Sequence, residues 1–345
     1  MKILIIQTAF LGDVVLTIPL IQAAKKYLKS EVSVLCIPST KDILVGHPDI
    51  DEIIVYDKKG KDRGIFNLFK LAKKIREKKY DTVLIPHPSF QSGFLAYLSG
   101  IKKRVGFCNS AGRFFLTKCI PFDKDKCQLE RYLDLMQYFG FELEKEKTKI
   151  YIDKKSDEYA DSTLDPSTSS GQVAQGRYFG INPGSVWATK RWLPERYAEL
   201  SDKIVDKFGG KIIIFGGVDD IDTASIVEKN MKKHPINLAG KTTLKQLTAL
   251  IKRCRVFITN DSGSMHIAAA LDIPTVAIFG PTVKRFGFFP YSDKAVVIEK
   301  DIKCRPCDRH GSNKCPRNHF NCMNKVTVDE VFGAVKKLYE YFEYN

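Results

Sequence analysis

Residues 255–282 constrain the fold more than any other part of this sequence. Residues 255–259 form a short, β-branched apolar run that is typical of a buried strand, and residues 274–279 form a second one. An Ala-rich segment, residues 267–271, lies between them and favours a helix. A strand, a helix and a second strand joined by short links make a βαβ unit, so this stretch predicts a parallel sheet.

A polar insert, residues 260–266 (NDSGSMH), separates the first of these strands from its helix. It falls at the carboxyl end of a parallel strand, where open α/β sheets bind ligands. Asp261 or Ser262 could simply cap the helix, since both residue types are favoured caps. Alternatively, Gly263 allows a ligand to approach the backbone, the helix N–H groups favour a phosphate, and Asp261 accepts hydrogen bonds from hydroxyls. An anion held beside a polyol indicates a nucleotide sugar.

Short apolar strands alternate with amphipathic helices along the rest of the chain. In the first half we expect strands at 3–6, 32–37, 53–56, 82–85 and 103–106, with helices at 14–28 and 65–78. In the second half we expect further strands at 178–182 and 211–215, with helices at 194–208, 221–233 and 244–252. This alternation predicts an α/β protein made of doubly wound, Rossmann-like domains.

The chain is too long, at 345 residues, for one ordinary core. We therefore expect two domains that face a cleft, residues 1–160 and residues 177–326, followed by a helix over residues 327–345. Residues 161–176 are rich in Ser, Thr, Gly and Gln and have little to bury. They predict a linker or a flexible insertion between the domains.

The chain is strongly basic, with 55 Lys and Arg against 40 Asp and Glu and a net charge of +15. This excess fits an anionic partner such as a nucleic acid, a membrane surface or a phosphorylated substrate, and equally a basic surface that only serves solubility. The first apolar run, residues 3–6, is too short for a signal peptide, and no apolar run approaches the length of a membrane span. We expect a soluble, cytoplasmic protein.

Two further loops carry candidate functional residues, and neither contains the Gly-x-Gly-x-x-Gly pattern of a dinucleotide-binding dehydrogenase. Asp13 follows the first strand and Gly12, which allows a tight turn. It could cap the first helix, or it could act as a general base that takes a proton from an incoming hydroxyl.

The second of these loops, residues 182–192 (NPGSVWATKRW), follows the first strand of the second half. Ser185 and Thr189 can donate hydrogen bonds to phosphate oxygens, and Lys190 can neutralise a diphosphate as it leaves. The alternative is a surface loop with Trp192 packed in the core.

Three segments in this order, LGDVVLTIPL, NPGSVWATKRWLPERYAEL and TNDSGSMHIAAALDIPTVAIFGPT, resemble glycosyltransferase family 9. Within that family the chain is similar to the heptosyltransferase II type. The resemblance implies a GT-B fold and inverting transfer of a heptose from ADP-heptose to an inner-core lipopolysaccharide acceptor, with no cofactor required for catalysis. It also implies a lipid-linked sugar acceptor at the inner leaflet, so the basic residues 58–63 and 102–104 could meet phosphate or an anionic membrane.

The resemblance also implies roles for single residues. Asp13 is similar to the catalytic base of the family, and Asp261 to the aspartate that holds the donor sugar. Lys190 matches the lysine beside the donor phosphates, and Ser185 falls at a phosphate-binding hydroxyl. The remaining residues that fall in the same donor loop are Ser262, Gly263 and His266.

A dense group of cysteines lies near the carboxyl terminus, made of Cys304, Cys307, Cys315 and Cys322. A CxxC pair with two further cysteines close by resembles the ligand spacing of a structural zinc, and free thiols in a loop are the alternative. A catalytic metal is not expected, because four thiolates would close the site. The other five cysteines are expected to be ordinary and unpaired.

Three functions are compatible with these features. The first is the ADP-heptose glycosyltransferase, and the second is a transferase that uses another nucleotide sugar to build a surface glycan. The third is a basic nucleic-acid-binding protein with a zinc module, which would need aromatic and cationic side chains clustered on one surface. The position of the polar loops at strand ends favours a transferase, so we expect no nucleic-acid partner.

Overall fold

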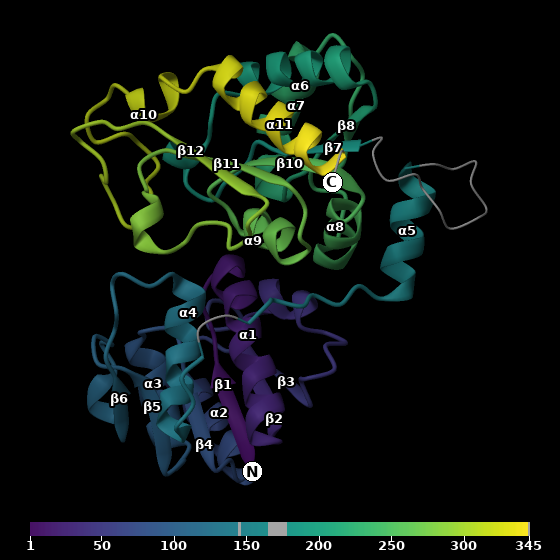
Figure 1. The fold of residues 1–345 in the computed structure, drawn as a ribbon. Coiled ribbons are helices and arrows are strands. Elements are labelled where there is room, and N and C mark those ends of the chain that lie inside the picture. The colour runs from purple at the N-terminus through teal and green to yellow at the C-terminus, as the bar shows by residue number, and fades with distance from the viewer. Residues whose placement is uncertain (144–145, 165–177, 344–345) are drawn as a thin grey trace. The chain divides into compact units, whose positions relative to one another are not determined.

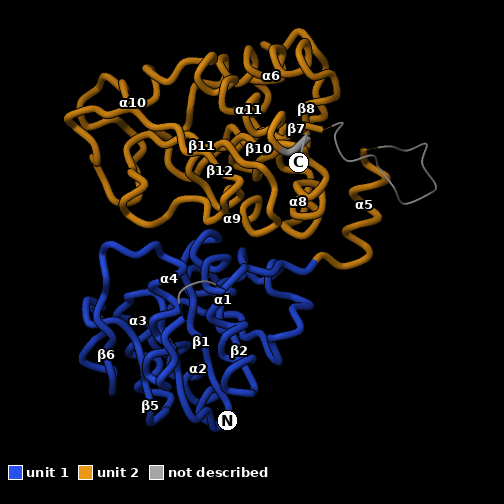
Figure 2. Tube along the Cα trace, viewed as in Figure 1, with its two compact units in different colours: residues 1–151 blue, residues 152–345 orange. Residues whose placement is uncertain are grey.

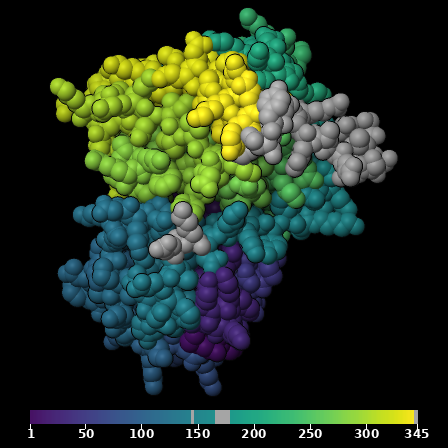
Figure 3. Space-filling model, in the orientation of Figure 1, coloured from purple at the N-terminus to yellow at the C-terminus, as the bar shows by residue number. Residues whose placement is uncertain are grey.

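The computed structural model describes residues 1–143, 146–164 and 178–343. The chain divides into two compact units, Met1–Tyr151 and Ile152–Asn345 (Figure 2). The surfaces of both units are drawn in Figure 3. No helix in the described residues is both long enough and apolar enough to span a membrane.

The first unit is built on a parallel six-stranded sheet with the order β3-β2-β1-β4-β5-β6 (Figure 1). Ile5 of the central strand pairs with Val34 on one side and with Leu84 on the other. The inner strands are buried on both faces, which explains their continuous apolar runs. The strands are β1 (Lys2–Ile6), β2 (Glu31–Cys36), β3 (Glu52–Val55), β4 (Thr82–Ile85), β5 (Lys103–Phe107) and β6 (Lys118–Ile120).

The helices of the first unit are α1 (Leu11–Leu28), α2 (Ile65–Glu77), α3 (Phe90–Leu98) and α4 (Gln128–Leu133), with short 3₁₀ turns η1 (Pro38–Ile43), η2 (Arg113–Phe115) and η3 (Asp134–Phe139). Helix α1 begins three residues earlier than the pattern predicted. Asp13 therefore lies inside the first helical turn, and Phe10 occupies the N-cap position. Asp13 does not cap this helix, so that alternative is wrong.

The second unit repeats the plan with a parallel sheet of order β12-β11-β10-β7-β8-β9. Helices α6, α7 and α11 cover one face of this sheet and α8 and α9 cover the other (Figure 1). Its strands are β7 (Tyr178–Asn182), β8 (Lys211–Ile214), β9 (Ile236–Asn237), β10 (Cys254–Asn260), β11 (Thr275–Phe279) and β12 (Ala295–Glu299). Its helices are α5 (Lys154–Leu164), α6 (Pro194–Phe208), α7 (Ile221–Asn230), α8 (Leu244–Ile251), α9 (Gly263–Ala270), α10 (Asn321–Asn324) and α11 (Val328–Glu343), with 3₁₀ turns at η4 (Ala188–Lys190), η5 (Val218–Asp220) and η6 (Lys284–Phe286).

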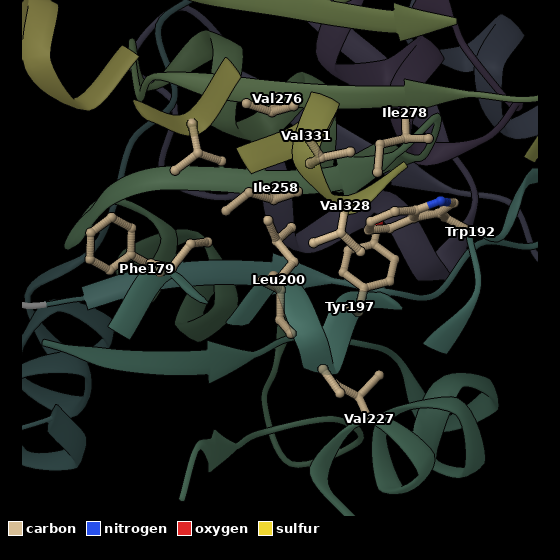
Figure 4. Close-up of a cluster of buried hydrophobic side chains, with 14 of the residues drawn as sticks. Phe179, Trp192, Tyr197, Leu200, Val227, Ile258, Val276, Ile278, Val328 and Val331 are labelled. Carbon is tan, nitrogen blue, oxygen red and sulfur yellow. The ribbon is translucent and has the colours of Figure 1, made fainter. Parts of the chain in front are cut away.

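The core of the second unit lies between the sheet and helices α6 and α11 (Figure 4). Trp192 is fully buried there, stacks edge-on against Tyr197 at 5.1 Å between ring centroids, and donates its indole N–H to the carbonyl oxygen of Val326 at 3.1 Å. Burying a Trp requires such a partner for its N–H group. Trp192 therefore packs in the core, as the alternative for this loop held, and it fixes one end of the loop that precedes it.

The boundary between the units lies at residues 151 and 152, nine residues before the predicted end of the first domain. Helix α5 causes the difference, because it packs on α8 of the second unit. Arg253, just after α8, forms ion pairs with Asp157 at 2.6 Å and with Asp161 at 2.7 Å. Both carboxylates lie on α5, so these ion pairs attach α5 to the rest of the second unit. Residues 161–164, predicted as linker, continue α5, and the rest of that segment lies outside the described residues.

The prediction of an α/β fold with two doubly wound, Rossmann-like units is confirmed. The edge strands β6, β9 and β12 were not predicted; β6 and β9 have only three and two residues, which is too few to show a period in the sequence. Two of the cysteines expected to be unpaired, Cys108 and Cys119, form a disulfide with their Cα atoms 4.8 Å apart. That expectation is wrong, because β5 and β6 pair in parallel with Phe107 opposite Ile120, which brings Cys108, just after β5, within reach of Cys119.

Candidate functional site

The polar loops of the second unit meet at the carboxyl edge of its sheet. Strands β11, β10, β7 and β8 are neighbours and parallel, so their exit loops converge at one edge. Asn260, at the end of β10, donates to the carbonyl oxygen of Pro183 at 2.8 Å. From the loop after β11, Thr282 donates its hydroxyl hydrogen to Oδ2 of Asp261 at 2.7 Å. The sequence predicted these loops at strand ends, and the structure brings them into contact.

Lys190 and Asp261 form an ion pair in this cluster, with Nζ 2.7 Å from Oδ2. Only 13% of the Lys190 side chain and 9% of the Asp261 side chain are exposed. From the sequence, Lys190 was expected beside the donor phosphates and Asp261 at the donor sugar. The ion pair shows that the two side chains are in direct contact. An ammonium has three N–H donors, so Lys190 can bond a phosphate oxygen while it keeps its bond to Asp261.

Helix α9 begins directly after this pair. Ser262 occupies its N-cap position with φ −149° and ψ 171°, but makes no side-chain capping bond. Its hydroxyl lies 2.9 Å from that of Ser264 and 3.1 Å from that of Thr259. The predicted cap at Ser262 is therefore not formed, and the first turn from Gly263 onward can present its N–H groups to an anion.

His266 lies in α9 beside the ion pair and is 5% exposed. Burial lowers the pKa of His266 to about 4, with Asp261 opposing the shift and Lys190 adding to it. Its Nδ1 atom has no hydrogen-bond partner among the described residues. The imidazole is therefore neutral near pH 7, so it can accept or donate one hydrogen bond but adds no positive charge.

Ser185 and Thr189, the two predicted phosphate-binding hydroxyls, are both buried. Ser185 donates to the carbonyl oxygen of Asp261 at 3.3 Å, within the cluster. Thr189 instead donates to the carbonyl oxygen of Ser312 at 2.7 Å and accepts the N–H of the same residue at 2.9 Å. A phosphate role for Thr189 stays a prediction, and it requires that hydroxyl to leave Ser312.

Asn260 organises the cluster, although no sequence feature distinguished it from the rest of the polar insert. It is fully buried. Its Oδ1 accepts the backbone N–H of Trp192 at 3.0 Å and the hydroxyl of Tyr197 at 3.1 Å, while its Nδ2 donates to Pro183. A buried amide with its bonds satisfied holds its neighbours in one arrangement, so Asn260 fixes the loop over residues 182–192 against β10.

Gly184 and Asp220 join the loop after β7 to the loop after β8. A Cβ atom at Gly184 would lie 2.1 Å from the carboxyl carbon of Asp220, so only glycine fits. The same carboxylate accepts the N–H of Gly217 at 3.0 Å and lies 3.6 Å from a guanidinium nitrogen of Arg191. Asp220, which follows Gly216 and Gly217, therefore helps to hold the loop after β8 against the loop after β7.

In the first unit, Asp13 occupies the matching position after β1. Its Oδ1 accepts the hydroxyl hydrogen of Tyr132 at 2.8 Å. Tyr132 lies on α4 and is 1% exposed. Burial, and then the charge of Asp13, raises the pKa of Tyr132 well above its ordinary value. The phenol is thus a permanent donor that orients the Asp13 carboxylate, and no sequence motif pointed to it.

Lys58 stands at the same edge of the first sheet. Its Nζ donates to the carbonyl oxygen of Thr8 at 2.8 Å, in the segment that leads to Asp13. Burial lowers the pKa of Lys58, and neighbouring Lys59 adds to the shift. Of the basic residues 58–63, this lysine is the one that the structure ties to the Asp13 segment.

The four cysteines of the carboxyl-terminal group lie near one another. Burial raises the pKa of Cys307 to about 11, and nearby Cys304, Cys322 and Cys315 add to the shift. The Cys307 thiol donates to the carbonyl oxygen of Cys304 at 2.9 Å, and Cys304 Sγ lies 3.7 Å from Nε2 of His319. Within the described residues, no group of three or more His, Cys, Asp or Glu side chains is arranged to hold a metal ion. A structural zinc stays a prediction.

Known proteins resemble the chain over nearly its whole length. Lipooligosaccharide heptosyltransferase 2 of Haemophilus ducreyi is 30% identical over 314 residues, which cover 86% of this chain and 88% of the relative. A solved structure of a family 9 glycosyltransferase from Veillonella parvula superposes with a TM-score of 0.87 at 27% identity, covering 99% of this chain and 97% of that one. The Escherichia coli structure described as ADP-heptose LPS heptosyltransferase II gives a TM-score of 0.81 at 25% identity, covering 99% and 100%.

The family assignment rests on the sequence as well as on the fold. The sequence model described as glycosyltransferase family 9 (heptosyltransferase) matches residues 68–316, which contain the loop with Lys190 and the loop with Asp261. The two-unit architecture with parallel sheets is the GT-B fold of the solved relatives. The chain therefore belongs to glycosyltransferase family 9 (heptosyltransferase) and is a glycosyltransferase.

Proposed function

We propose that this enzyme transfers a heptose from ADP-heptose to an inner-core lipopolysaccharide acceptor, with inversion at the anomeric carbon. The names of the relatives support the substrate class, since they describe lipopolysaccharide or lipooligosaccharide heptosyltransferases and an ADP-heptose-dependent enzyme. The observation that carries the proposal is the buried Lys190–Asp261 pair at the start of α9.

On the donor side, the pair supplies the two kinds of group that a nucleotide sugar needs. Lys190 and the N–H groups of the first turn of α9 face the charge of a diphosphate. Asp261 offers carboxylate oxygen to sugar hydroxyls, and the Thr282 hydroxyl holds its Oδ2 in place. Because the side chains are largely withdrawn from water, their electrostatic effect on a bound diphosphate is stronger than that of surface groups.

In the reaction, Asp13 takes the proton of the acceptor hydroxyl. The hydroxyl oxygen forms a bond to the anomeric carbon as the bond between that carbon and the diphosphate oxygen breaks, and ADP leaves with the electron pair. Tyr132 supports the role of Asp13, because its hydrogen bond holds the carboxylate in one orientation. Lys190 and the α9 amides stabilise the charge that develops on the leaving diphosphate.

On the acceptor side, the basic residues near Asp13 fit a phosphorylated, lipid-linked sugar at the inner leaflet. Lys58 is the leading residue, since it is partly buried and bonded to the segment before Asp13. A cation there would bind an acceptor phosphate by charge-assisted hydrogen bonds. We place the reaction at the cytoplasmic side of the membrane, where such an acceptor meets a nucleotide donor.

The deciding experiment is calorimetric binding of ADP-heptose, ADP, UDP and GDP to the wild type and to Lys190→Ala. We expect the wild type to bind ADP-heptose tightly. Lys190→Ala should bind it about a hundredfold more weakly, since a charge-assisted contact contributes about 2–3 kcal/mol. Lys207→Ala, a change at an exposed lysine of α6, is the control. A preference for UDP or GDP would keep a glycosyltransferase but replace the heptose donor, and unchanged binding to Lys190→Ala would overturn the phosphate site.

A further inference from the structure

Five aromatic side chains gather on the outside of the first unit, and we call this surface the aromatic face. Phe115 of η2 is the centre, with ring centroids 5.3 Å from Phe90, 5.3 Å from Phe94 and 5.6 Å from Tyr97, all on α3. Phe114 adjoins Phe115 in η2 and is 80% exposed, while Phe90 and Tyr97 are each 54% exposed. Clustered apolar side chains of this size in water indicate an interaction surface.

The aromatic face is held rigidly by the backbone beneath it. Gly93 of α3 and Gly112 before η2 touch, and a Cβ on Gly112 would lie 2.7 Å from the carbonyl oxygen of Ser89. Two glycines thus let the segment from 108 to 119 lie directly against α3. The Cys108–Cys119 disulfide closes the base of that segment. The exposed rings are therefore presented by a fixed scaffold.

Two arginines contact rings of the aromatic face, and the stretch of sequence that forms the face contains no acidic residue. Residues 82–122 contain no Asp or Glu. The guanidinium of Arg113 lies 4.9 Å from the ring of Phe114, and that of Arg104 lies 5.6 Å from the ring of Tyr97. The exposed cations of the same stretch are Lys102, Lys103, Arg113 and Lys118. The segment, blue in Figure 3, forms part of the outer surface of the first unit.

We propose that the aromatic face docks on an anionic lipid membrane. Aromatic rings favour the level of the lipid headgroups, and Lys and Arg beside them are attracted to anionic lipids. A soluble anionic polymer would match the charge but would leave the rings without an apolar environment. The combination of exposed rings and cations in contact with them therefore fits a lipid surface best.

The position of the aromatic face suggests why docking on a membrane would serve the reaction. Phe90 begins the helix that follows β4, and Asp13 lies in the helix that follows β1. Strands β1 and β4 are parallel neighbours, so Phe90 and Asp13 stand at the same edge of the first sheet. Docking through this face brings that edge to the membrane in which a lipid-linked acceptor resides. The reason for docking rests on the proposed function, whereas the docking itself rests on the face alone.

The test measures co-flotation of the full-length protein with phosphatidylcholine vesicles that contain phosphatidylglycerol. We expect Phe114→Ser to weaken binding about tenfold, which is the cost of losing one inserted aromatic side chain. Arg113→Gln should weaken it about fivefold, and raised salt should weaken binding of the wild type. Phe66→Ser on α2 is the matched control, because Phe66 is also 80% exposed but lies outside the aromatic face. We expect Phe66→Ser to bind as the wild type does.

Three outcomes would overturn the proposal. They are equal binding to vesicles of phosphatidylcholine alone, equal losses in Phe114→Ser and Phe66→Ser, or vesicle binding by Phe114→Ser that matches the wild type. If Phe114→Ser instead dissociates a dimer seen by light scattering, the face pairs two copies of the chain, and the membrane proposal is overturned in that case too. Transfer to a water-soluble, delipidated acceptor separates the two proposals. It should be unchanged in Phe114→Ser if docking alone is lost, and it should be absent even in the wild type if the proposed function is wrong.

Discussion

The hydroxyl of Tyr132 donates a hydrogen bond to Asp13 at 2.8 Å across 119 residues of sequence. The phenol comes from the buried side of α4, and the carboxylate comes from the first turn of α1. A carboxylate that is held by a buried donor has a fixed direction, as the proposed general base requires.

Replacing the base should therefore abolish most of the activity. We expect Asp13→Asn to lower kcat about 10²–10⁴-fold, the usual contribution of a general base, with little change in donor affinity. Tyr132→Phe should lower kcat by a smaller factor, about tenfold, because it removes only the orienting hydrogen bond. Steady-state kinetics with saturating donor measures both. Normal kcat in Asp13→Asn would rule out its role as the base.

The Lys190–Asp261 pair should affect stability as well as donor binding. Lys190→Met leaves the Asp261 carboxylate buried without its cation, so we expect the free energy of unfolding to fall by about 3 kcal/mol. The double variant Lys190→Met/Asp261→Asn should recover most of that loss, because it removes the unpaired charge. Urea unfolding of the wild type, Lys190→Met, Asp261→Asn and the double variant gives the coupling. The double variant should still bind ADP-heptose poorly, and strictly additive losses would contradict the pairing.

His266 should make stability depend on pH. Burial lowers the pKa of His266 to about 4, whereas the unfolded chain has the ordinary value of about 6.5. Between these values the unfolded state binds more protons, so stability is full above about pH 6.5 and falls as the pH drops toward 4. The loss amounts to about 3 kcal/mol across that window. We expect His266→Gln to flatten the decline in urea unfolding, and parallel curves for both proteins would contradict it.

The four cysteines near the carboxyl terminus lead to a separate prediction. If Cys304, Cys307, Cys315 and Cys322 hold a structural zinc, the purified protein should contain about one equivalent of it, and Cys315→Ser should lose the metal and unfold more readily. Cys127→Ser is the control, since Cys127 is a buried free thiol elsewhere. Elemental analysis decides between the two interpretations. Less than about a tenth of an equivalent of any transition metal would leave free thiols in a loop.

Local patterns predicted most of the architecture. Helix α6 was predicted with its true bounds, because Pro194 begins it and its apolar side chains recur at helical spacing. Helix α1 was predicted three residues too short, because Leu11 and Gly12 read as loop and its apolar residues extend around most of the helix. Helices of that kind show little periodicity, so their starts are hard to place.

The candidate site was predictable residue by residue but not in its contacts. Lys190 and Asp261 each follow a strand of the sheet, which sequence alone can show. Their bond joins residues 71 positions apart, and it depends on the order of the strands, which sequence alone did not give. Asn260 was missed for the same reason, because its partners lie in the loop before α6 and in α6 itself, more than sixty residues earlier.

The attachment of α5 by Arg253 bears on how such enzymes could be recombined. A chimera that takes its second unit from this chain should begin at Ile152, because Arg253 then keeps both Asp157 and Asp161. A junction at residue 177 would leave the guanidinium, which is 12% exposed, without either carboxylate. The boundary at which units could be exchanged thus precedes α5. A chimera receives that helix together with the loops that carry Lys190 and Asp261.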